Sequence, residues 1–529
     1  MPTPQRARRP PYGCGARGNY NGETIVEEIS MNNKTYAWML LLPIFTVALL
    51  LVPSSKAQTP EKVTIHWDKV VRVSKTTPTL QVVVNPPLRR GSTIHDRAFQ
   101  TLRDLGCDYV RYVPWLPYPR LGVAELEPPK DGKTSWDFSL IDPLTMDFLD
   151  ATQGHSVILN FSTIPQWMFK SDRPLALPAG PDQVTWDYEQ GTELRDPSMK
   201  EVADYYARLV SWYTQGGFTD EYGQRHDSGH HYDIAYWEVL NEVDFEHQMT
   251  PEFYTSLYDA IVGAIHAADP KIKFMALALA APSKNPKFFE YFLNPKNHKA
   301  AVPLDMISYH FYADPAADES PAVWQYTFFE QADHFLDVVR YIESIRQRLS
   351  PDMRTDLDEL GAILPDDNIM LRAPIPESYW NLCGAMYAYL YAQLAGLGID
   401  VAGESQLVGY PTQFPSVSMV DWNTGRPNAR SWILKLLRDN FGSGDKLVET
   451  KVGFSSVYAQ GFATRDGKRK ILLINKRSRP VVLSVPSAAG AQVDFVDQTT
   501  GLNPPGSAKL PQEQVGLDGF AVAVVSLPQ

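Results

Sequence analysis

Short apolar runs alternate with helical patterns between about residue 80 and residue 440. The runs are rich in β-branched and aromatic residues and have the length of buried strands. The segments between them repeat apolar residues every three or four positions, which predicts helices such as 202–213, 255–268, 335–347 and 379–395. The eight predicted strands are 81–85, 109–113, 156–161, 234–237, 273–277, 306–310, 356–359 and 399–403.

Eight alternations of strand and helix predict a (β/α)8 TIM barrel over residues 81–442. An open doubly wound sheet is the alternative, but it would need a glycine-rich phosphate-binding turn that the sequence lacks. Residues 446–529 carry short alternating or β-branched runs between Asp, Gly and Pro turns, which predicts an accessory C-terminal β-sandwich. Residues 58–80 include a similar run, and we expect it to add a strand to that sandwich.

Residues 1–57 are predicted to be an N-terminal extension and a signal peptide. An apolar stretch, 38–53, follows Lys34, and small residues precede a cleavage site after Ala57. The stretch is short for a membrane span. We therefore expect a start at Met31 and a secreted protein, extracellular or periplasmic, without stable membrane insertion; a retained anchor through 38–53 is the alternative.

The composition excludes several classes of function. The formal net charge of −12 argues against a nucleic-acid partner. The sequence has no Walker loop, no zinc-ligand spacing and no Gly-x-Ser-x-Gly motif, so we expect no metal and no other cofactor. The 12 Trp and 26 Tyr residues suit stacking against sugar rings, although most must belong to the core.

Polar residues occur at the carboxyl ends of the predicted strands, where a barrel of this kind has its reactive groups. Asn241 and Glu242 end the fourth strand, and Glu359 ends the seventh, so the two glutamates face each other across the barrel. Glycoside hydrolysis requires such a pair, because one carboxylic acid protonates the leaving oxygen while the other carboxylate attacks the anomeric carbon. Further candidates for substrate binding are Arg111, Trp115, Trp167, His310, Tyr312, Glu404 and Trp422.

The segment 237–244, taken with 307–312 and 357–361, resembles the clan A glycoside hydrolases. Within the clan it is most similar to family 39, the family of β-xylosidases and α-L-iduronidases, which also carries an appended β-sandwich. Clan members end strand four in Asn-Glu and strand seven in Glu, and they often have an Arg on strand two and His-x-Tyr after strand six. The matching residues, in order, are Arg111, Asn241, Glu242, His310, Tyr312 and Glu359.

The resemblance implies that Glu242 is the general acid/base and Glu359 the nucleophile of a retaining hydrolase with a β-xyloside-like substrate. It also implies that Asn241 bonds the 2-hydroxyl of the sugar. We expect the apolar strand end and the charge of Glu359 to raise the pKa of Glu242. Hydrogen bonds from Arg111 and Tyr312 are expected to keep Glu359 ionised.

The sequence departs from the clan pattern at two places. Val243 stands where Pro is usual, and Asp358 precedes Glu359 where Thr is usual. Asp358 is therefore an alternative nucleophile. Because successive side chains of a strand point to opposite faces, we expect only one of these two acids to point into the barrel.

Each supporting residue also has a structural interpretation. Arg111 could neutralise Glu238, His310 could be a core histidine, Glu404 could form a salt bridge at the rim, and the three tryptophans could pack loops. At the level of function, the alternatives are a transglycosylase of the same fold and a non-catalytic carbohydrate-binding protein. In each case the expected partner is an oligosaccharide, a polysaccharide or another glycoside.

Overall fold

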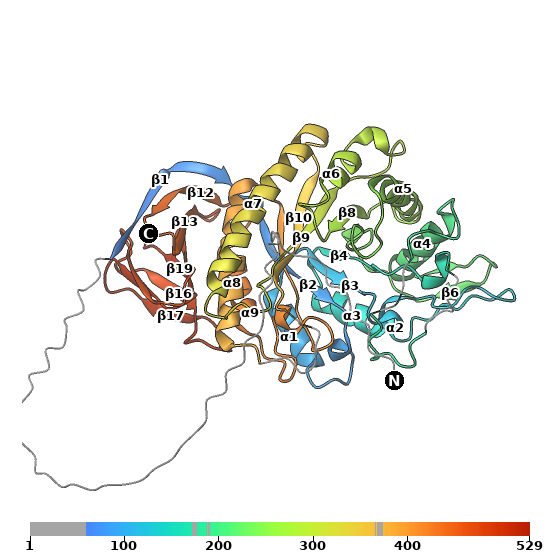
Figure 1. Ribbon diagram of the computed structural model, residues 1–529, viewed down its shortest axis with the longest axis horizontal. Helices are drawn as coiled ribbons and strands as arrows, with labels where there is room; N and C mark the ends of the chain where they lie inside the picture. Colours follow the sequence, from blue (N-terminus) through green and yellow to red (C-terminus); the bar gives the residue numbers. More distant parts are fainter. Residues whose placement is uncertain are drawn as a thin grey trace, which may run out of the picture.

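The computed structural model describes residues 60–171, 177–186, 188, 191–365, 367 and 374–528. Eight parallel strands close into a barrel in the order β10-β11-β2-β3-β4-β7-β8-β9 (Figure 1). The predicted fold class is confirmed, and each predicted strand overlaps an observed one. The strands are β2 (Thr77–Val83), β3 (Val110–Val113), β4 (Val157–Leu159), β7 (Tyr236–Glu238), β8 (Lys273–Leu279), β9 (Met306–Ala313), β10 (Arg354–Ala362) and β11 (Val401–Glu404).

Helices cover the outside of the barrel, with their apolar faces against it. In α1, for example, Ala98, Phe99, Leu102 and Leu105 are buried at helical spacing, and the helix ends at Gly106 in the left-handed conformation. The α-helices are α1 (His95–Leu105), α2 (Pro119–Gly122), α3 (Ile141–Ala151), α4 (Lys200–Thr214), α5 (Pro251–Ala268), α6 (Pro286–Phe292), α7 (Trp324–Leu349), α8 (Glu377–Leu397) and α9 (Ala429–Asn440). Short 3-10 helices are η1 (Pro86–Leu88), η2 (Gln166–Met168), η3 (Pro295–Asn297) and η4 (Pro415–Val417).

The barrel strands also contribute to a small apolar cluster of their own. It contains the buried side chains of Ile158, Tyr236, Met275, Met306 and Val401, one from each of five strands. Further along β7 and β9, toward their carboxyl ends, the buried side chains include the polar and charged residues Glu238, Ser308 and His310. The barrel therefore has an apolar layer near its amino end and a charged layer toward its carboxyl end, which is where TIM barrels have their active sites.

The C-terminal part forms one curled nine-stranded sheet around a second apolar core, which includes Val63, Leu473 and Val525. Its order is β17-β16-β19-β14-β13-β12-β1-β15-β18, so β1 (Glu61–Val73) lies between β12 and β15 although it precedes the barrel in sequence. Figure 1 shows β1 beside β12. The remaining strands are β12 (Lys446–Val452), β13 (Val457–Ala463), β14 (Arg469–Asn475), β15 (Val481–Ser484), β16 (Gln492–Val496), β17 (Gly506–Lys509), β18 (Gln514–Leu517) and β19 (Val522–Ser526). A separate hairpin pairs β5 (Gly217–Thr219) with β6 (Arg225–Asp227).

The predicted signal peptide, its alternative as a membrane anchor and the predicted start at Met31 all lie outside the described residues. Within the described part of the chain, none of the helices combines the length and the apolar character that crossing a membrane requires.

Candidate active site

The backbone makes an unusual turn where β7 ends. Leu240 and Glu242 have φ angles of 66° and 42°, in the left-handed region that residues other than glycine seldom adopt. The Glu242 amide donates to the carbonyl of Ala278 at 2.9 Å, and Ala278 itself has a φ of 43°. Strained backbone of this kind persists only where the surrounding structure holds it, and it is common at functional sites.

The turn brings Glu242 close to Glu359 and His310. One carboxylate oxygen of each glutamate and a ring nitrogen of His310 all lie within 4.8 Å of one another. The Nδ1 atom of His310 is 3.0 Å from Oε1 of Glu242 and 3.5 Å from Oε2 of Glu359. The structure therefore brings together the two glutamates that the sequence places on opposite sides of the barrel.

Both carboxylate oxygens of Glu359 accept a hydrogen bond. Nη1 of Arg111 donates to Oε1 at 2.6 Å, and the Tyr312 hydroxyl donates to Oε2 at 2.6 Å. The Tyr312 oxygen also lies 2.5 Å from Oγ of Ser405. The guanidinium and the phenol thus fix the orientation of the Glu359 carboxyl group.

Arg111 is fully buried and bonded to protein groups on all sides. Its Nε lies 2.5 Å from Oε2 of Glu238 and 2.9 Å from Oδ2 of Asp358. Its Nη1 donates to Glu359, and its Nη2 donates to Oδ1 of Asn241 at 2.6 Å. Arg111 therefore neutralises Glu238, as one of the two interpretations of its sequence position predicted. It also orients Glu359 and Asn241, the residue next to Glu242.

Asp358 and Glu359 both face this cluster, so the expectation that only one of them would point into the barrel is wrong. The reason is an irregularity in β10. Asp356 pairs with Ser308 and Glu359 pairs with His310, so β10 advances by three residues where β9 advances by two. An extra residue of this kind breaks the alternation of side chains along a strand. Asp358 contacts Arg111 and lies 3.6 Å from Nε2 of His310.

The electrostatic environment separates the acids. Burial raises the pKa of Glu242, and the negative charge of Glu359 raises it further. The hydrogen bond from His310 lowers it, but the pKa remains above its usual value. For Asp358, the charges of Arg111 and His310 outweigh burial and lower the pKa. Burial would lower the pKa of His310, but the charges of Glu359 and Asp358 raise it well above its usual value.

Sequence reasoning missed a third glutamate at the site. Glu246 follows Glu242 by one turn, because its amide donates to the Glu242 carbonyl at 2.7 Å. Its Oε1 accepts from the indole of Trp115 at 2.5 Å and from Nδ2 of Asn241 at 2.9 Å. Burial and the charge of Glu242 raise its pKa well above the usual range. The spacing of four residues within a tight turn was the available signal.

Trp115 also belongs to a cluster of half-buried aromatic rings beside Glu246. Its ring centroid is 5.3 Å from that of Trp186, in an edge-to-face arrangement, and 6.1 Å from that of Phe414. Trp186 and Phe414 are 5.8 Å apart. Rings at this position offer an apolar surface next to the carboxylates.

Three residues predicted to bind substrate have other partners. Trp167 is buried, donates to the Glu125 carbonyl at 2.8 Å and lies under the guanidinium of Arg195. Glu404 forms a fully buried ion pair with Arg430 at 2.7 Å, not a salt bridge at the rim, and burial raises its pKa to about 7. Trp422 packs partly buried against the main core.

The group Glu242, His310 and Glu359 also has the spacing of metal ligands. Arg111, however, donates directly to Glu359. A guanidinium in the first contact shell of a carboxylate disfavours a second cation on that carboxylate. The arrangement is therefore better suited to acid–base and nucleophilic chemistry than to metal binding.

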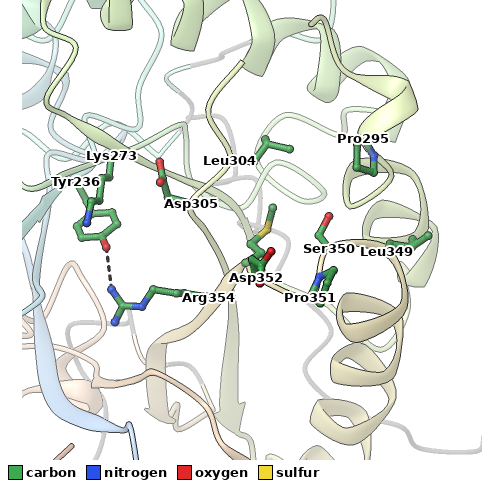
Figure 2. Close-up of a pocket in the computed structure, with 11 residues that line it drawn as sticks. Tyr236, Lys273, Pro295, Leu304, Asp305, Leu349, Ser350, Pro351, Asp352 and Arg354 are labelled. Carbon is green, nitrogen blue, oxygen red and sulfur yellow. Dashed lines mark hydrogen bonds between the residues drawn. The ribbon is translucent and has the colours of Figure 1, made fainter. Parts of the chain in front are cut away.

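A separate pocket of about 560 Å³ lies at the opposite end of the barrel (Figure 2). It is lined by residues at the beginnings of β7, β8 and β10, among them Tyr236, Lys273 and Arg354. Arg354 donates to the Tyr236 hydroxyl at 2.8 Å (Figure 2). The amino end of such a barrel contributes to stability, so we do not assign this pocket to the chemistry.

Comparison with known proteins supports the same class of fold. The model of the family described as "Alpha-L-arabinofuranosidase 1 domain" matches residues 177–339. A search of curated protein sequences gives no match. Many solved structures match, and those named next are examples.

The family 51 arabinofuranosidase of Xanthomonas axonopodis pv. citri is 12% identical, with a TM-score of 0.61, and the match covers 88% of this chain and 100% of that one. The family 30 endoxylanase of Clostridium papyrosolvens is 16% identical, with a TM-score of 0.55 and the same coverage. A glucosidase of Croceicoccus marinus is 14% identical, with a TM-score of 0.57, and the match covers 89% of this chain and 100% of that one. The chain thus shares its fold with these solved glycoside hydrolases of families 51 and 30.

Proposed function

We propose that the protein is a retaining glycoside hydrolase in which Glu242 is the general acid/base and Glu359 is the nucleophile. The observation that carries this proposal is the approach of their carboxylate oxygens to within 4.8 Å at the carboxyl end of the barrel. Carboxyl groups about 5–5.5 Å apart are typical of retaining enzymes, and about 6.5–9.5 Å of inverting ones. The 4.8 Å refers to the nearest oxygens of the two groups, and this close approach supports retention over inversion.

In the first step, protonated Glu242 gives its proton to the glycosidic oxygen while Glu359 attacks the anomeric carbon. The carbon–oxygen bond to the leaving group breaks, and a glycosyl ester of Glu359 forms. In the second step, ionised Glu242 takes a proton from water, the water oxygen attacks the anomeric carbon, and Glu359 leaves as a carboxylate. Esterification removes the charge of Glu359, so the pKa of Glu242 falls between the steps, as its change of role requires.

We infer that the substrate is a pentoside. The matched family is named for α-L-arabinofuranosidase, several structural neighbours are named as arabinofuranosidases or xylanases, and the sequence pattern resembles the β-xylosidase family 39. Within this proposal, Asn241 binds the 2-hydroxyl and Trp115 contacts the sugar ring. A panel of aryl pentosides, hexosides and uronides tests the inference; cleavage of hexosides alone would contradict it.

The roles of the two acids can be tested with Glu359→Gly. We expect this variant to lose turnover and to regain it with azide, giving a glycosyl azide of inverted configuration, because azide enters where the nucleophile stood. Asp358→Gly is the matched comparison, since Asp358 is adjacent and also buried. Azide rescue of Asp358→Gly instead would assign the nucleophile to Asp358.

We also propose that the protein is secreted, on the basis of the apolar stretch 38–53 and the small residues before position 58. N-terminal sequencing of the native protein tests this. The expected result is a chain that begins at residue 58; a chain that retains residues 1–57 would contradict the proposal.

A further inference from the structure

We propose that Asp358 keeps His310 doubly protonated, and that the resulting cation controls when Glu242 releases and regains its proton. Asp358 is then a positioning residue that acts through His310. The kinetic part of this inference rests on the proposed function. The protonation of His310 does not, and it can be measured separately.

The geometry around His310 calls for two ring protons. Its Nδ1 is 3.0 Å from Glu242 Oε1 and 3.5 Å from Glu359 Oε2, and its Nε2 is 3.6 Å from Asp358 Oδ1. A neutral imidazole carries a proton on one nitrogen only. Either Nε2 would then face Asp358 without a proton, or Nδ1 would take up the acidic proton of Glu242 as a hydrogen bond while its lone pair lies 3.5 Å from Glu359 Oε2. Both arrangements place an unprotonated ring nitrogen near a carboxylate oxygen, and the ring is almost completely buried, so water cannot separate the two.

Asp358 is in a position to be the permanent counter-ion of this ring. Its carboxylate is fully buried, and Arg111 approaches Oδ2 at 2.9 Å. Glu359 loses its charge when it becomes an ester and Glu242 changes its protonation in each step, so Asp358 is the carboxylate next to the ring whose charge persists through the cycle. The titratable and charged groups around His310 and its direct partners are Glu242, Glu359, Asp358, Arg111, Glu238, Tyr312 and Glu246.

With His310 as a cation, Arg111 and His310 face the carboxyl groups of Glu238, Asp358 and Glu359. These carboxyl groups already match or outnumber the two cations, so a further negative charge on Glu242 is disfavoured and Glu242 keeps its acidic proton in the resting enzyme. When Glu242 gives this proton to the leaving oxygen, its new carboxylate lies 3.0 Å from the imidazolium and is stabilised by it. His310 keeps both of its protons throughout, so the proton balance of the two hydrolytic steps is unchanged.

Without the charge of Asp358, His310 should release its proton more easily. A neighbouring opposite charge shifts a pKa by about 1–3 units, so the ring should deprotonate at a pH lower by about that amount. Glu242 would then lose the cation beside it, and its pKa would rise. The alkaline limb of the pH profile of kcat/KM should therefore move to higher pH, and the maximal rate should fall by about tenfold, less than the 10²–10⁴-fold expected for complete loss of general acid catalysis.

The experiment is nitrogen NMR of the protein labelled at histidine, with the His310 signals assigned by their loss in His310→Asn. In the unmodified protein we expect both ring nitrogens of His310 to be protonated at pH 7, and in Asp358→Asn we expect deprotonation at a lower pH. Asp259→Asn is the matched control, because Asp259 forms another buried pair with a histidine, 2.7 Å from Nδ1 of His298. It should change neither the His310 signals nor the pH profile.

A single protonated nitrogen on His310 at pH 7 would overturn the inference, and so would an Asp358→Asn variant with unchanged His310 titration. The spectrum of the unmodified protein decides the matter even if Asp358→Asn does not fold. If no glycoside is cleaved, the proposed function fails, and the NMR result still decides whether Asp358 holds the proton on His310.

Discussion

Glu246 shows how a residue next to the acid pair can matter through its partners. Its Oε1 holds the indole of Trp115 and the amide of Asn241, and both of these lie at the expected sugar position. Removing an acceptor from partly buried donors costs about 1–3 kcal/mol because the donors are left unpaired. Glu246 is therefore expected to affect substrate binding more than the chemical step.

We predict that Glu246→Ala raises KM and lowers kcat/KM by about tenfold or more, which corresponds to the loss of these hydrogen bonds. Glu246→Gln keeps an oxygen acceptor at the same place and should stay within about threefold of the unmodified protein. Steady-state kinetics on an aryl pentoside measures both. Equal losses in the two variants would show that the carboxyl group itself, and not its hydrogen bonds, is required.

Glu125 provides the comparison for Glu246. It is a buried carboxyl group whose pKa burial raises to about 8, and it accepts a hydrogen bond from the Ser135 amide. Glu125→Ala should leave KM unchanged. A comparable rise of KM in this variant would mean that the effect at Glu246 reports general damage to the loops around the barrel.

At the scale of elements, the irregularity in β10 decides which side chains reach the site. Because β10 advances by three residues where β9 advances by two, both Asp358 and Glu359 reach the cluster around Arg111 and His310. The pairing of β10 with its other neighbour, β11, shifts register at the same place, between Leu357 and Leu360 of β10. Gly403 on β11 lies against this point, since a Cβ atom on it would be 2.9 Å from the Asp358 carbonyl oxygen.

We predict that Gly403→Ala displaces β10 at Asp358 and thereby reduces activity. The added methyl group meets backbone atoms and not a flexible side chain, so overpacking should also cost about 1–3 kcal/mol of stability. Gly263→Ala is the control, because a Cβ atom there meets nothing within 4 Å and alanine stabilises a helix interior by about 0.5–1 kcal/mol. Thermal unfolding and kinetics measure both variants; full activity in Gly403→Ala would show that the strand adapts without moving Glu359.

The elements could be predicted because their signals are local. Strand runs and helical spacing indicated the eight barrel strands and their order of occurrence, and polar strand ends located Arg111, Glu242, His310 and Glu359. The irregularity in β10 could not be predicted, because it depends on pairing between two strands. The partner of Glu404, Arg430, is likewise set by how α9 packs on the barrel.

At the scale of the whole molecule, β1 connects the beginning of the described chain to the C-terminal sheet. It pairs antiparallel with β12 from Val63 to Val73 and parallel with β15 at Glu61 and Lys62. Without β1, the sheet would divide into a six-stranded part and the β15–β18 pair. Two-stranded sheets are at best marginally stable alone, so β1 should be needed for the integrity of the sheet.

Two truncated chains test the role of β1, one that begins at residue 58 and one that begins at residue 74 and therefore also lacks residues 58–73. We predict that the first is as stable as the full chain and that the second has a destabilised C-terminal sheet. The deletion removes Val63 from the second apolar core and leaves the edges of β12 and β15 unpaired. Calorimetry of the two truncated chains should show a lower unfolding temperature, or a separate early transition, for the shorter one alone. Val63→Ala tests the packing contribution with the strand retained, and it should cost about 1–3 kcal/mol because two methyl groups of a fully buried side chain are lost. Unchanged unfolding of the chain that lacks residues 58–73 would show that the sheet closes without β1.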